Sequence, residues 1–217
     1  MDDIVKKFKV VKDKKVSLKD YDPEYSKGYK KEDAAGLLTE FRAELNELQG
    51  QLYASNKHSL LIIFQAMDAA GKDSAIEHTM SGLNPQGCQV FSFKQPSAEE
   101  LDHDFIWRHY KALPERGRIG IHNRSHYENV LICKVHPEFI LNERMSSVST
   151  VNDIDKGFWT ARYKSIRDFE EHISRNGTVI IKFFLYVSKD EQKKRFLERI
   201  DEPLKNWKFS SSDIDER

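Results

Sequence analysis

Residues 59–74 read SLLIIFQAMDAAGKDS, and this stretch decides the fold. An apolar run from Ser59 to Gln65 leads into a turn of small residues that ends in Gly71-Lys72, and a helical pattern follows. A strand, a glycine-lysine turn and a helix in this order are typical of a phosphate-binding loop. The backbone N–H groups of such a turn and the helix N-terminus behind it attract phosphate oxygens. The stretch therefore predicts a phosphate loop in which Lys72 reaches a phosphate oxygen as a point charge.

The loop departs from the common pattern of glycine, four residues, glycine, lysine and a hydroxyl residue. Ala66 stands at the first glycine position, Asp73 follows the lysine, and Ser74 comes one position late. The hydroxyl that usually contacts magnesium is therefore displaced, but Asp68 and Asp73 offer carboxylates, which suit this ion. The alternative is an ordinary strand-to-helix turn with a surface lysine.

Length and composition favour one α/β domain with a well-formed core. The chain has 217 residues, of which 39% are apolar and 11% aromatic. Lys plus Arg and Asp plus Glu number 35 each, so a nucleic-acid partner is not expected and a polyanion site must be a local patch. Cys88 and Cys133 lack metal-ligand spacing, which favours a reduced, cytoplasmic protein. We expect neither a secretion signal nor a membrane span.

Periodicity and turn residues predict the remaining elements. Helices are expected at 31–53, 74–81, 97–113, 154–174 and 189–200, and strands at 59–65, 88–94, 118–122 and 178–187. Ser97 and Glu100 form the capping box of the third helix. In the first helix the apolar stripe is Leu37, Leu38, Phe41, Leu45, Leu48 and Leu52. Helices that alternate with strands predict an α/β fold with a mainly parallel sheet.

The chain is expected to divide into a basic N-terminal arm with an amphipathic helix (1–56), a core (57–187) and a basic lid with a truncated C-terminal segment (188–217). Tyr21, Tyr25 and Tyr29 of the arm are expected to pack on the body, with solvated lysines around them. The alternative is an arm that helps to gather a polyanion. In the third segment Arg195 and Arg199 share a helix face, as in lids that close over phosphates.

Polar residues after the strands are candidate ligand contacts. Arg124 follows the strand 118–122, and in a parallel sheet ligands bind at the carboxyl ends of strands. Its guanidinium can pair with phosphoryl oxygens, and Glu128 lies one helical turn further on. The alternative is a surface ion pair. His103, Asp104 and Arg108 could hold a small ligand or form a helix surface. Arg162 and Arg167 lie off the apolar stripe of their helix and could reach the site or solvent.

Several blocks together resemble the polyphosphate kinase 2 family. The blocks are Gln65 to Asp73, Phe93 to Ser97, His103-Asp104-Phe105 with Trp107-Arg108, Pro114 to Gly117, Asn123 to Glu128, Glu191-Gln192 with Arg195 and Arg199, and Trp207-Lys208-Phe209 with Asp213. They run in family order from about residue 57 to the end of the sequence. The combination is far more specific than any one block.

The resemblance implies a P-loop NTPase-like core of the thymidylate-kinase type with a helical lid. It implies reversible phosphoryl transfer between inorganic polyphosphate and nucleoside mono- or diphosphates, with Mg2+ as cofactor. The form of the block Asn123 to Glu128 is similar to the subgroup that uses AMP and ADP; ATP is the product, and guanine nucleotides are a further option. The family also implies a homo-oligomer, and no nucleic acid or membrane partner.

By position, the resemblance assigns catalysis to Asp68, Lys72, Arg124 and Glu128, with Asp68 and Glu128 at the metal. Polyphosphate contacts are expected from Ala69, Ala70, Gly71, Lys72, Asp73, Ser74, Arg195 and Arg199. Nucleotide contacts are expected from Lys94, Pro96, His103, Asp104, Arg108, Asn123, Arg124 and Arg162.

The sequence also differs from the family pattern. Ala66 and Ser74 replace glycines of many members and are small enough to be tolerated. Asn123 stands where other branches have Asp, which moves the expected metal role to Asp68 and Glu128. Members usually continue past the position of Arg217, so a C-terminal helical segment is expected to be missing. Two other functions stay open: an ATP-dependent nucleoside monophosphate kinase and a non-catalytic binder of polyphosphate or nucleotide.

Overall fold

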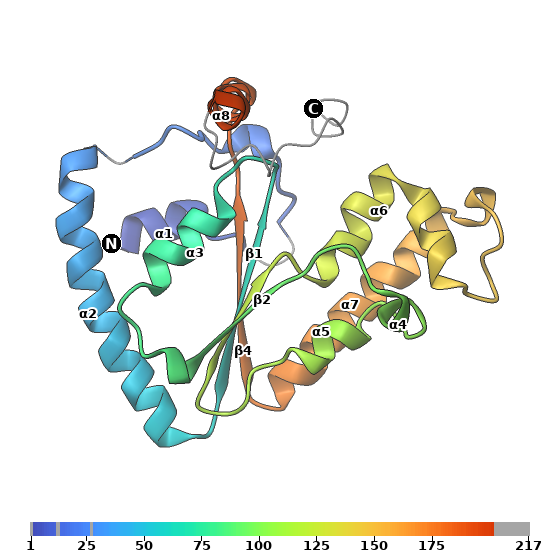
Figure 1. The fold of residues 1–217 in the computed structure, drawn as a ribbon, viewed down its shortest axis with the longest axis horizontal. Coiled ribbons are helices and arrows are strands. Elements are labelled where there is room, and N and C mark those ends of the chain that lie inside the picture. Colours follow the sequence, from blue (N-terminus) through green and yellow to red (C-terminus); the bar gives the residue numbers. More distant parts are fainter. Residues whose placement is uncertain (1, 12–13, 27, 202–217) are drawn as a thin grey trace. The chain divides into compact units, whose positions relative to one another are not determined.

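The computed structural model describes residues 2–11, 14–26 and 28–201, and the chain forms two compact units. The larger unit comprises Arg42–Ala66 and Lys72–Phe184 (Figure 1). The smaller unit contains the described residues up to 41, the loop Met67–Gly71 and residues 185–201. The helix α2 (Lys31–Ser55) begins in the smaller unit and ends in the larger one. The division into segments 1–56, 57–187 and 188–217 stays a prediction.

The larger unit is built on a sheet of four strands in the order β2-β3-β1-β4. The strands are β1 (Ser59–Ala66), β2 (Cys88–Ser92), β3 (Ile119–Asn123) and β4 (Thr178–Leu185), so all four predicted strands are confirmed. β3 pairs in parallel with both β1 and β2, and Ile121 lies opposite Ile62 and Val90. Ser59 Oγ donates to Thr178 Oγ1 at 3.0 Å, so β1 and β4 start at the same end.

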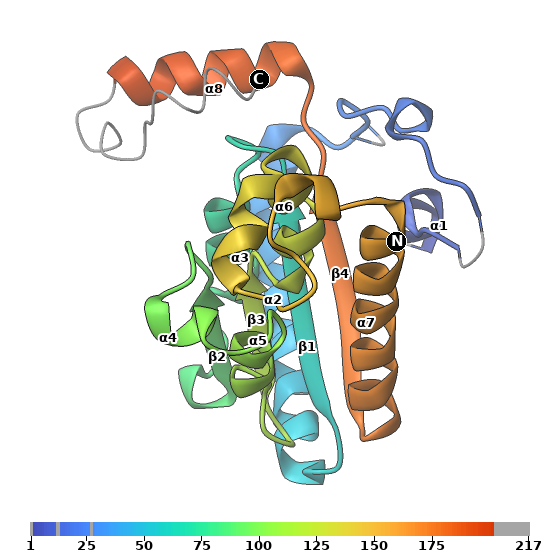
Figure 2. The same cartoon turned by 90° about the vertical axis from the view of Figure 1, so that its right-hand side faces the viewer.

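Helices cover both faces of this sheet (Figures 1 and 2). On one face α3 (Lys72–Met80) contributes Ile76 to a core with Phe64, Ile119 and Ile121, and Leu52 of α2 packs against it. On the other face α7 (Lys156–Arg175) packs its apolar stripe on β1, with Phe169 and Ile173 against Leu61 and Ile63. Alternate side chains of β1 thus serve opposite cores, as the pleat of a strand requires.

Short helices after β3 form a third apolar cluster. They are η3 (His126–Val130), α6 (Ile132–Val135), η4 (Pro137–Glu143) and η5 (Val151–Asp153). Cys133, Ile140 and Val148 are buried there, with Phe158 and Trp159 of α7 against them. No helix was predicted between the strand 118–122 and the helix 154–174, so these short helices, η4 among them, are additions that the structure makes. A further 3₁₀ turn, η2 (Pro85–Gly87), leads into β2.

The helix predicted at 97–113 is wrong in its extent. The capping box of Ser97 and Glu100 is confirmed, but the helix that it begins, α4 (Ala98–Leu101), is short. A second helix, α5 (Trp107–Lys111), follows a break. The carboxylate of Asp104 accepts a hydrogen bond from the backbone N–H of Ile106 at 2.9 Å. Such a local bond from a side chain to the backbone competes with helix formation, so the first helix ends and a second one begins after the turn.

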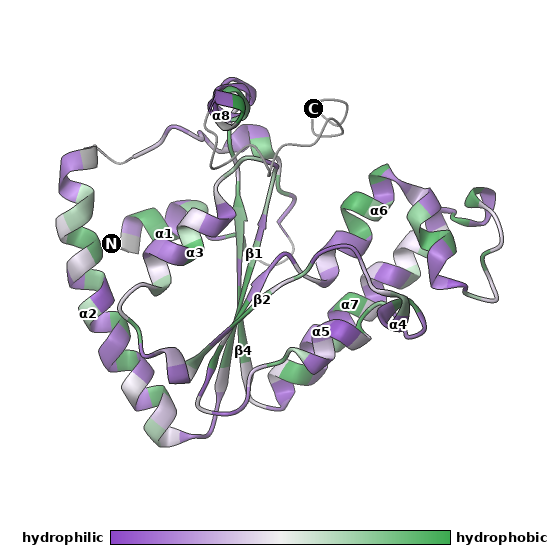
Figure 3. Cartoon of the chain, in the orientation of Figure 1, coloured by the Kyte–Doolittle hydropathy of each residue, from purple (hydrophilic) through white to green (hydrophobic). Residues whose placement is uncertain are grey.

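The apolar stripe predicted along α2 is wrong at one position. Leu48 is 51% exposed, whereas its neighbour Gln49 is only 4% exposed. The Gln49 amide donates to the carbonyl oxygen of Asn84 and accepts from the Asn84 N–H, both at 2.9 Å. The side chain thereby provides hydrogen-bond partners for the backbone N–H and carbonyl groups of Asn84, ahead of β2. Figure 3 shows the mixture of polar and apolar residues along α2.

The smaller unit holds the N-terminal helix α1 (Asp2–Phe8), the 3₁₀ turn η1 (Leu18–Asp20) and the basic helix α8 (Lys189–Asp201). The Phe8 ring contacts Tyr21 and Tyr25 at centroid distances of 6.3 and 5.8 Å. These tyrosines therefore pack on α1 itself. The helix predicted at 189–200 is confirmed. Within the described part of the chain, no helix has both the length and the apolar character that crossing a membrane requires.

Candidate functional site

The loop Met67–Gly71 of the smaller unit is held by the helix α8. Gln192 Nε2 donates to the carbonyl oxygen of Asp68 at 3.0 Å, and Arg195 Nη1 donates to that of Ala69 at 3.2 Å. Gly71 has a φ of +89°, and a Cβ added there would lie 3.3 Å from Arg195 Nη1. Both the backbone conformation and the close approach therefore favour glycine at position 71.

Arg195 is also fixed along its own helix. Its Nε donates to Glu191 Oε1 at 2.8 Å, and this bond holds the pKa of the Glu191 carboxyl below its usual range. Arg195, a predicted polyphosphate contact, is thus directed to the phosphate loop of its own unit. The side chain of Arg199 lies outside the described residues, as do Trp207, Lys208, Phe209 and Asp213.

In the larger unit, α3 begins at Lys72, directly after the loop. The side-chain amide of Asn123 donates to Asp73 Oδ1 at 2.8 Å, which joins the end of β3 to the first turn of α3. The backbone N–H of Arg124 donates to the carbonyl oxygen of Phe64 at 3.0 Å. The turn that carries Arg124 therefore lies where β1 ends and α3 begins, as the rule for parallel sheets predicts.

The expectation that Arg124 and Glu128 share one helical turn is wrong. Arg124 has a left-handed backbone with a φ of +65° and precedes η3. Ser125 caps η3 by accepting from the Tyr127 N–H at 3.3 Å, and Glu128 lies within this 3₁₀ helix. Arg124 is exposed and Glu128 is half-buried. The two residues are thus placed by a tight turn and its cap.

The predicted nucleotide contacts around α4 have local structural partners. Arg108 Nη1 donates to the Lys94 carbonyl at 3.0 Å and to Glu100 Oε2 at 3.1 Å. Partial burial tends to raise the pKa of the Glu100 carboxyl, but bonds from Ser97 and Arg108 lower it overall. The His103 ring stacks on Trp107 at 3.7 Å. Asp104 caps the chain before α5, as described above, whereas Lys94 and Pro96 are exposed.

Arg162 is buried, so the expectation that it lies off the buried face of α7 is wrong. Its Nη1 and Nη2 donate to the two carboxylate oxygens of Glu143, at 2.8 and 2.5 Å. Its guanidinium also lies over the rings of Phe105 and Phe158, at 4.3 and 4.9 Å from their centroids. Its role as a nucleotide contact stays a prediction. Arg167 on the same helix is exposed.

The remaining predicted residues belong to the loop and the start of α3. Ala70 and Lys72 are half-buried, and Asp73 and Ser74 are exposed. Within the described ranges no group of three or more His, Cys, Asp or Glu side chains could hold a metal ion. Mg2+ is usually bound by one or two carboxylates together with substrate phosphates and water. Of the two predicted metal ligands, Asp68 belongs to the smaller unit and Glu128 to the larger one, and each offers one carboxylate.

Sequence reasoning did not predict the roles of two residues near these elements. Gln192 belongs to a block that resembles the family, but no role was predicted for it; it holds the loop through the main-chain carbonyl of Asp68. Glu170 accepts hydrogen bonds from His126 and Tyr127, two of the three residues between Arg124 and Glu128. A signal was available for Glu170, because it lies four residues after Ile166 on the buried face of α7. An acidic residue at such a position points to a buried partner.

The parallel sheet with the order β2-β3-β1-β4, and the phosphate loop after β1, define a P-loop kinase-like fold. A family profile described as polyphosphate kinase 2 matches residues 28–217. The chain belongs to this family.

Individual relatives match nearly the whole chain. It is 56% identical over 213 residues to an ADP-polyphosphate phosphotransferase of Rhodopseudomonas palustris, covering 98% of this chain and 73% of that protein. It is 39% identical to an AMP/ADP-polyphosphate phosphotransferase of Meiothermus ruber, covering 98% and 75%. The crystal structure of polyphosphate kinase 2 from Arthrobacter aurescens TC1 matches with a TM-score of 0.81 and 41% identity, covering 93% of this chain and 68% of the other.

Proposed function

We propose that this protein transfers phosphoryl groups reversibly between inorganic polyphosphate and nucleoside mono- and diphosphates, converting AMP to ADP and ADP to ATP. Membership in the polyphosphate kinase 2 family supports the activity. The two relatives described above are named for ADP and for AMP/ADP as the nucleotide substrates, which supports this substrate class.

One observation supports placing the proposed phosphoryl transfer at the edge of the sheet where β1 and β3 end and α3 begins. The Asn123 amide contacts Asp73 at the start of α3, and the Arg124 N–H contacts the end of β1. The arginine-bearing turn and the lysine-bearing helix start therefore belong to the same edge of one sheet. Phosphoryl transfer depends chiefly on positioning and on neutralising phosphate charge, and such an edge supplies both.

We assign the cationic contacts to polyphosphate by charge. Polyphosphate carries roughly one negative charge per phosphate, whereas the formal net charge of the chain is zero. The positive charge must therefore be concentrated locally, and Lys72, Arg124, Arg195 and Arg199 are its proposed source. The backbone N–H groups of residues 69–74 complete the contacts, because a turn before a helix N-terminus attracts phosphate.

Asp68 and Glu128 are the proposed ligands of Mg2+. When bound, Mg2+ supplies additional neutralisation of phosphate charge. On the nucleotide side we assign the contacts to Lys94, Pro96, Asn123 and Arg124. His103, Asp104, Arg108 and Arg162 stay proposed nucleotide contacts, in addition to the structural partners described above.

Lys72→Ala tests this function. The purified protein is incubated with Mg2+, polyphosphate and either AMP or ADP, and the nucleotides are separated. We expect Lys72→Ala to reduce turnover at least about 10²- to 10³-fold with an unchanged circular dichroism spectrum, because a charge at the transferring phosphate is lost. Lys164→Ala, on the exposed face of α7, is the matched control and should keep full activity. Near-normal turnover by folded Lys72→Ala protein would contradict the assignment.

The same assay separates the other candidate functions. Replacing polyphosphate by ATP, with AMP as acceptor, tests for an ordinary nucleotide kinase. Tight polyphosphate binding without product would indicate a non-catalytic binder. GMP and GDP in place of AMP and ADP test guanine nucleotides, and light scattering tests the proposed homo-oligomer. The two free cysteines agree with the proposed cytoplasmic location.

A further inference from the structure

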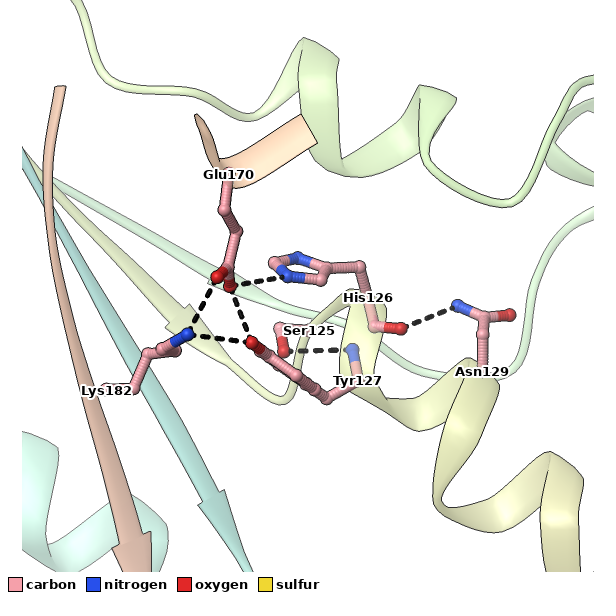
Figure 4. A network of polar contacts seen from close by, with 6 residues as sticks. All are labelled: Ser125, His126, Tyr127, Asn129, Glu170 and Lys182. Carbon is pink, nitrogen blue, oxygen red and sulfur yellow. Dashed lines mark hydrogen bonds and ion pairs between the residues drawn. The ribbon is translucent and has the colours of Figure 1, made fainter. Parts of the chain in front are cut away.

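A charged hydrogen-bond network joins the turn after β3 to α7 and β4 (Figure 4). Glu170 of α7 is at its centre. Its Oε1 accepts from His126 Nε2 at 3.2 Å and from the Tyr127 hydroxyl at 2.7 Å. Its Oε2 accepts from Lys182 Nζ at 2.7 Å, and the same ammonium donates to the Tyr127 hydroxyl at 2.8 Å. One carboxylate therefore holds two consecutive residues of the turn.

The centre of the network is shielded from water, whereas Lys182 at its edge is 47% exposed. The His126 side chain is fully buried and the Glu170 side chain is 15% exposed. Burial tends to raise the pKa of Glu170, but the bonds from His126, Lys182 and Tyr127 lower it to about 2, so the carboxylate is ionised at neutral pH. Lys182 balances its charge. In a buried polar network, removing one member leaves its partners unpaired, and this loss is costly.

The residues held by Glu170 lie between two candidate catalytic residues. Arg124 directly precedes Ser125, His126 and Tyr127, and Glu128 directly follows them. Arg124 has a left-handed backbone conformation, which persists in a residue other than glycine only when its surroundings impose it. The Glu128 N–H donates to the Ser125 carbonyl at 2.9 Å, and the Asn129 amide donates to the His126 carbonyl at 3.3 Å. The turn is thus short, tightly bonded and anchored at its middle.

We propose that Glu170 is a positioning residue for phosphoryl transfer, which fixes Arg124 and Glu128 through His126 and Tyr127. Lys182 supports it by balancing its charge. Small displacements of catalytic groups reduce rates strongly, so an anchor at the centre of this turn controls the rate without touching substrate. This inference rests on the proposed function, because it requires Arg124 and Glu128 to act in the transfer step.

Glu170→Gln is the direct test. Glutamine keeps the length of the side chain but replaces one acceptor oxygen by an NH2 donor, which must face the N–H of His126 or the ammonium of Lys182. We expect kcat to fall about 10- to 100-fold while the KM for polyphosphate changes less than about threefold. Glu171→Gln is the matched control, because Glu171 is the next residue of α7 and makes an exposed pair with Arg175. It should leave both constants unchanged.

A double-variant cycle separates positioning from a general effect on the fold. Arg124→Lys keeps the charge but loses the forked geometry, so residual activity can be measured. If Glu170 acts by placing the Arg124 guanidinium, Glu170→Gln should slow the Arg124→Lys protein less than about threefold. Independent effects that multiply would overturn the inference. If Glu170→Gln fails to fold, Tyr127→Phe removes a single hydroxyl of the network; it should lower kcat severalfold, and full activity would overturn the inference.

Failure of the inference and failure of the proposed function are distinguishable. An unchanged protein that phosphorylates neither AMP nor ADP from polyphosphate would overturn the function and the inference with it. An active unchanged protein whose Glu170→Gln variant matches Glu171→Gln would overturn the inference alone.

Discussion

Ala69 and Arg124 have left-handed backbone conformations although neither is glycine, with φ values of +58° and +65°. A side chain in this region costs about 1–2 kcal/mol relative to the right-handed form. Both residues are predicted phosphate contacts, and strained backbone is often found at binding sites, where the surrounding structure imposes it. Ala69 is held by Arg195 at its carbonyl, and Arg124 by Phe64 at its N–H.

Ala69→Gly should stabilise the protein. Removing the Cβ relieves the strain, while the greater freedom of glycine in the unfolded chain offsets part of the gain, so we expect about 0.5–1 kcal/mol in the free energy of unfolding. Urea denaturation measures the change. Ala70→Gly is the control, since Ala70 has no positive φ and should lose about 0.5–1 kcal/mol. A loss of stability in Ala69→Gly equal to that of the control would show that position 69 is unstrained.

For the helix α7, the sequence predicted the apolar contacts but not the polar ones. Its apolar stripe predicted a helix against the sheet, and Phe169 and Ile173 confirm it. The same buried face carries Arg162 and Glu170, whose partners lie in η4, η3 and β4. Periodicity describes one element at a time, so polar pairs between distant segments leave no pattern that a single sequence displays.

In the other elements too, features set by local sequence patterns were predicted, whereas features set by single side-chain bonds were not. The strands were found because each is a run of apolar and β-branched residues bounded by turn residues. The break between α4 and α5 was missed because the Asp104 cap competes locally with a helical pattern. At the site, the rule for parallel sheets predicted that the Arg124 turn lies beside the start of α3. The hold of Gln192 on the loop passes through a main-chain carbonyl and could not be predicted.

Arg162→Met should destabilise the protein by about 3–5 kcal/mol, because it leaves the largely buried Glu143 carboxylate without its partner. Arg167→Met, on the exposed side of α7, should change the free energy of unfolding by less than about 0.5 kcal/mol. Adding Glu143→Gln to Arg162→Met should restore part of the loss. If Arg162→Met is instead as stable as Arg167→Met but raises the KM for nucleotide, Arg162 serves the ligand and not the fold.

At the scale of the whole molecule, a buried group of histidines makes stability sensitive to acid. His109, His122 and His126 are fully buried, and within the described structure the Nδ1 atom of each has no hydrogen-bond partner. Burial lowers the pKa of His109 to about 2, with the charges of His126 and Arg108 adding to it. Burial also lowers that of His122 to about 4, against a bond from its ring to the Ala112 carbonyl. Both rings are neutral in the folded protein at pH 7.

The free energy of unfolding should therefore fall as the pH drops below about 6.5. The unfolded chain takes up protons on His109 and His122 from about pH 6.5, whereas the folded protein does so only near pH 4 and below. By pH 5, His109 and His122 should each lower the free energy of unfolding by up to about 2 kcal/mol. Urea denaturation at pH 7.5 and pH 5 measures this. Glu170, with a pKa of about 2, contributes only at pH values below about 4.5.

A pair of single variants checks the origin of the acid sensitivity. His122→Gln should reduce the difference between pH 7.5 and pH 5, since its group no longer titrates. His58→Gln, at an exposed histidine, should leave the difference unchanged. Equal unfolding free energies at the two pH values in the unchanged protein would show that the buried rings do not control stability.

The position of β1 in the sheet has a consequence for how the chain folds. Both neighbours of β1 come late in the chain: Leu60 is opposite Ile119, and the Ser59 hydroxyl bonds to Thr178, 119 positions away. The strand that carries the phosphate loop therefore finds its pairing partners only after long stretches of chain have been brought together. Proteins dominated by such distant contacts fold slowly and expose unpaired strands on the way. Refolding of this protein should be slow, and low concentrations should favour recovery over aggregation.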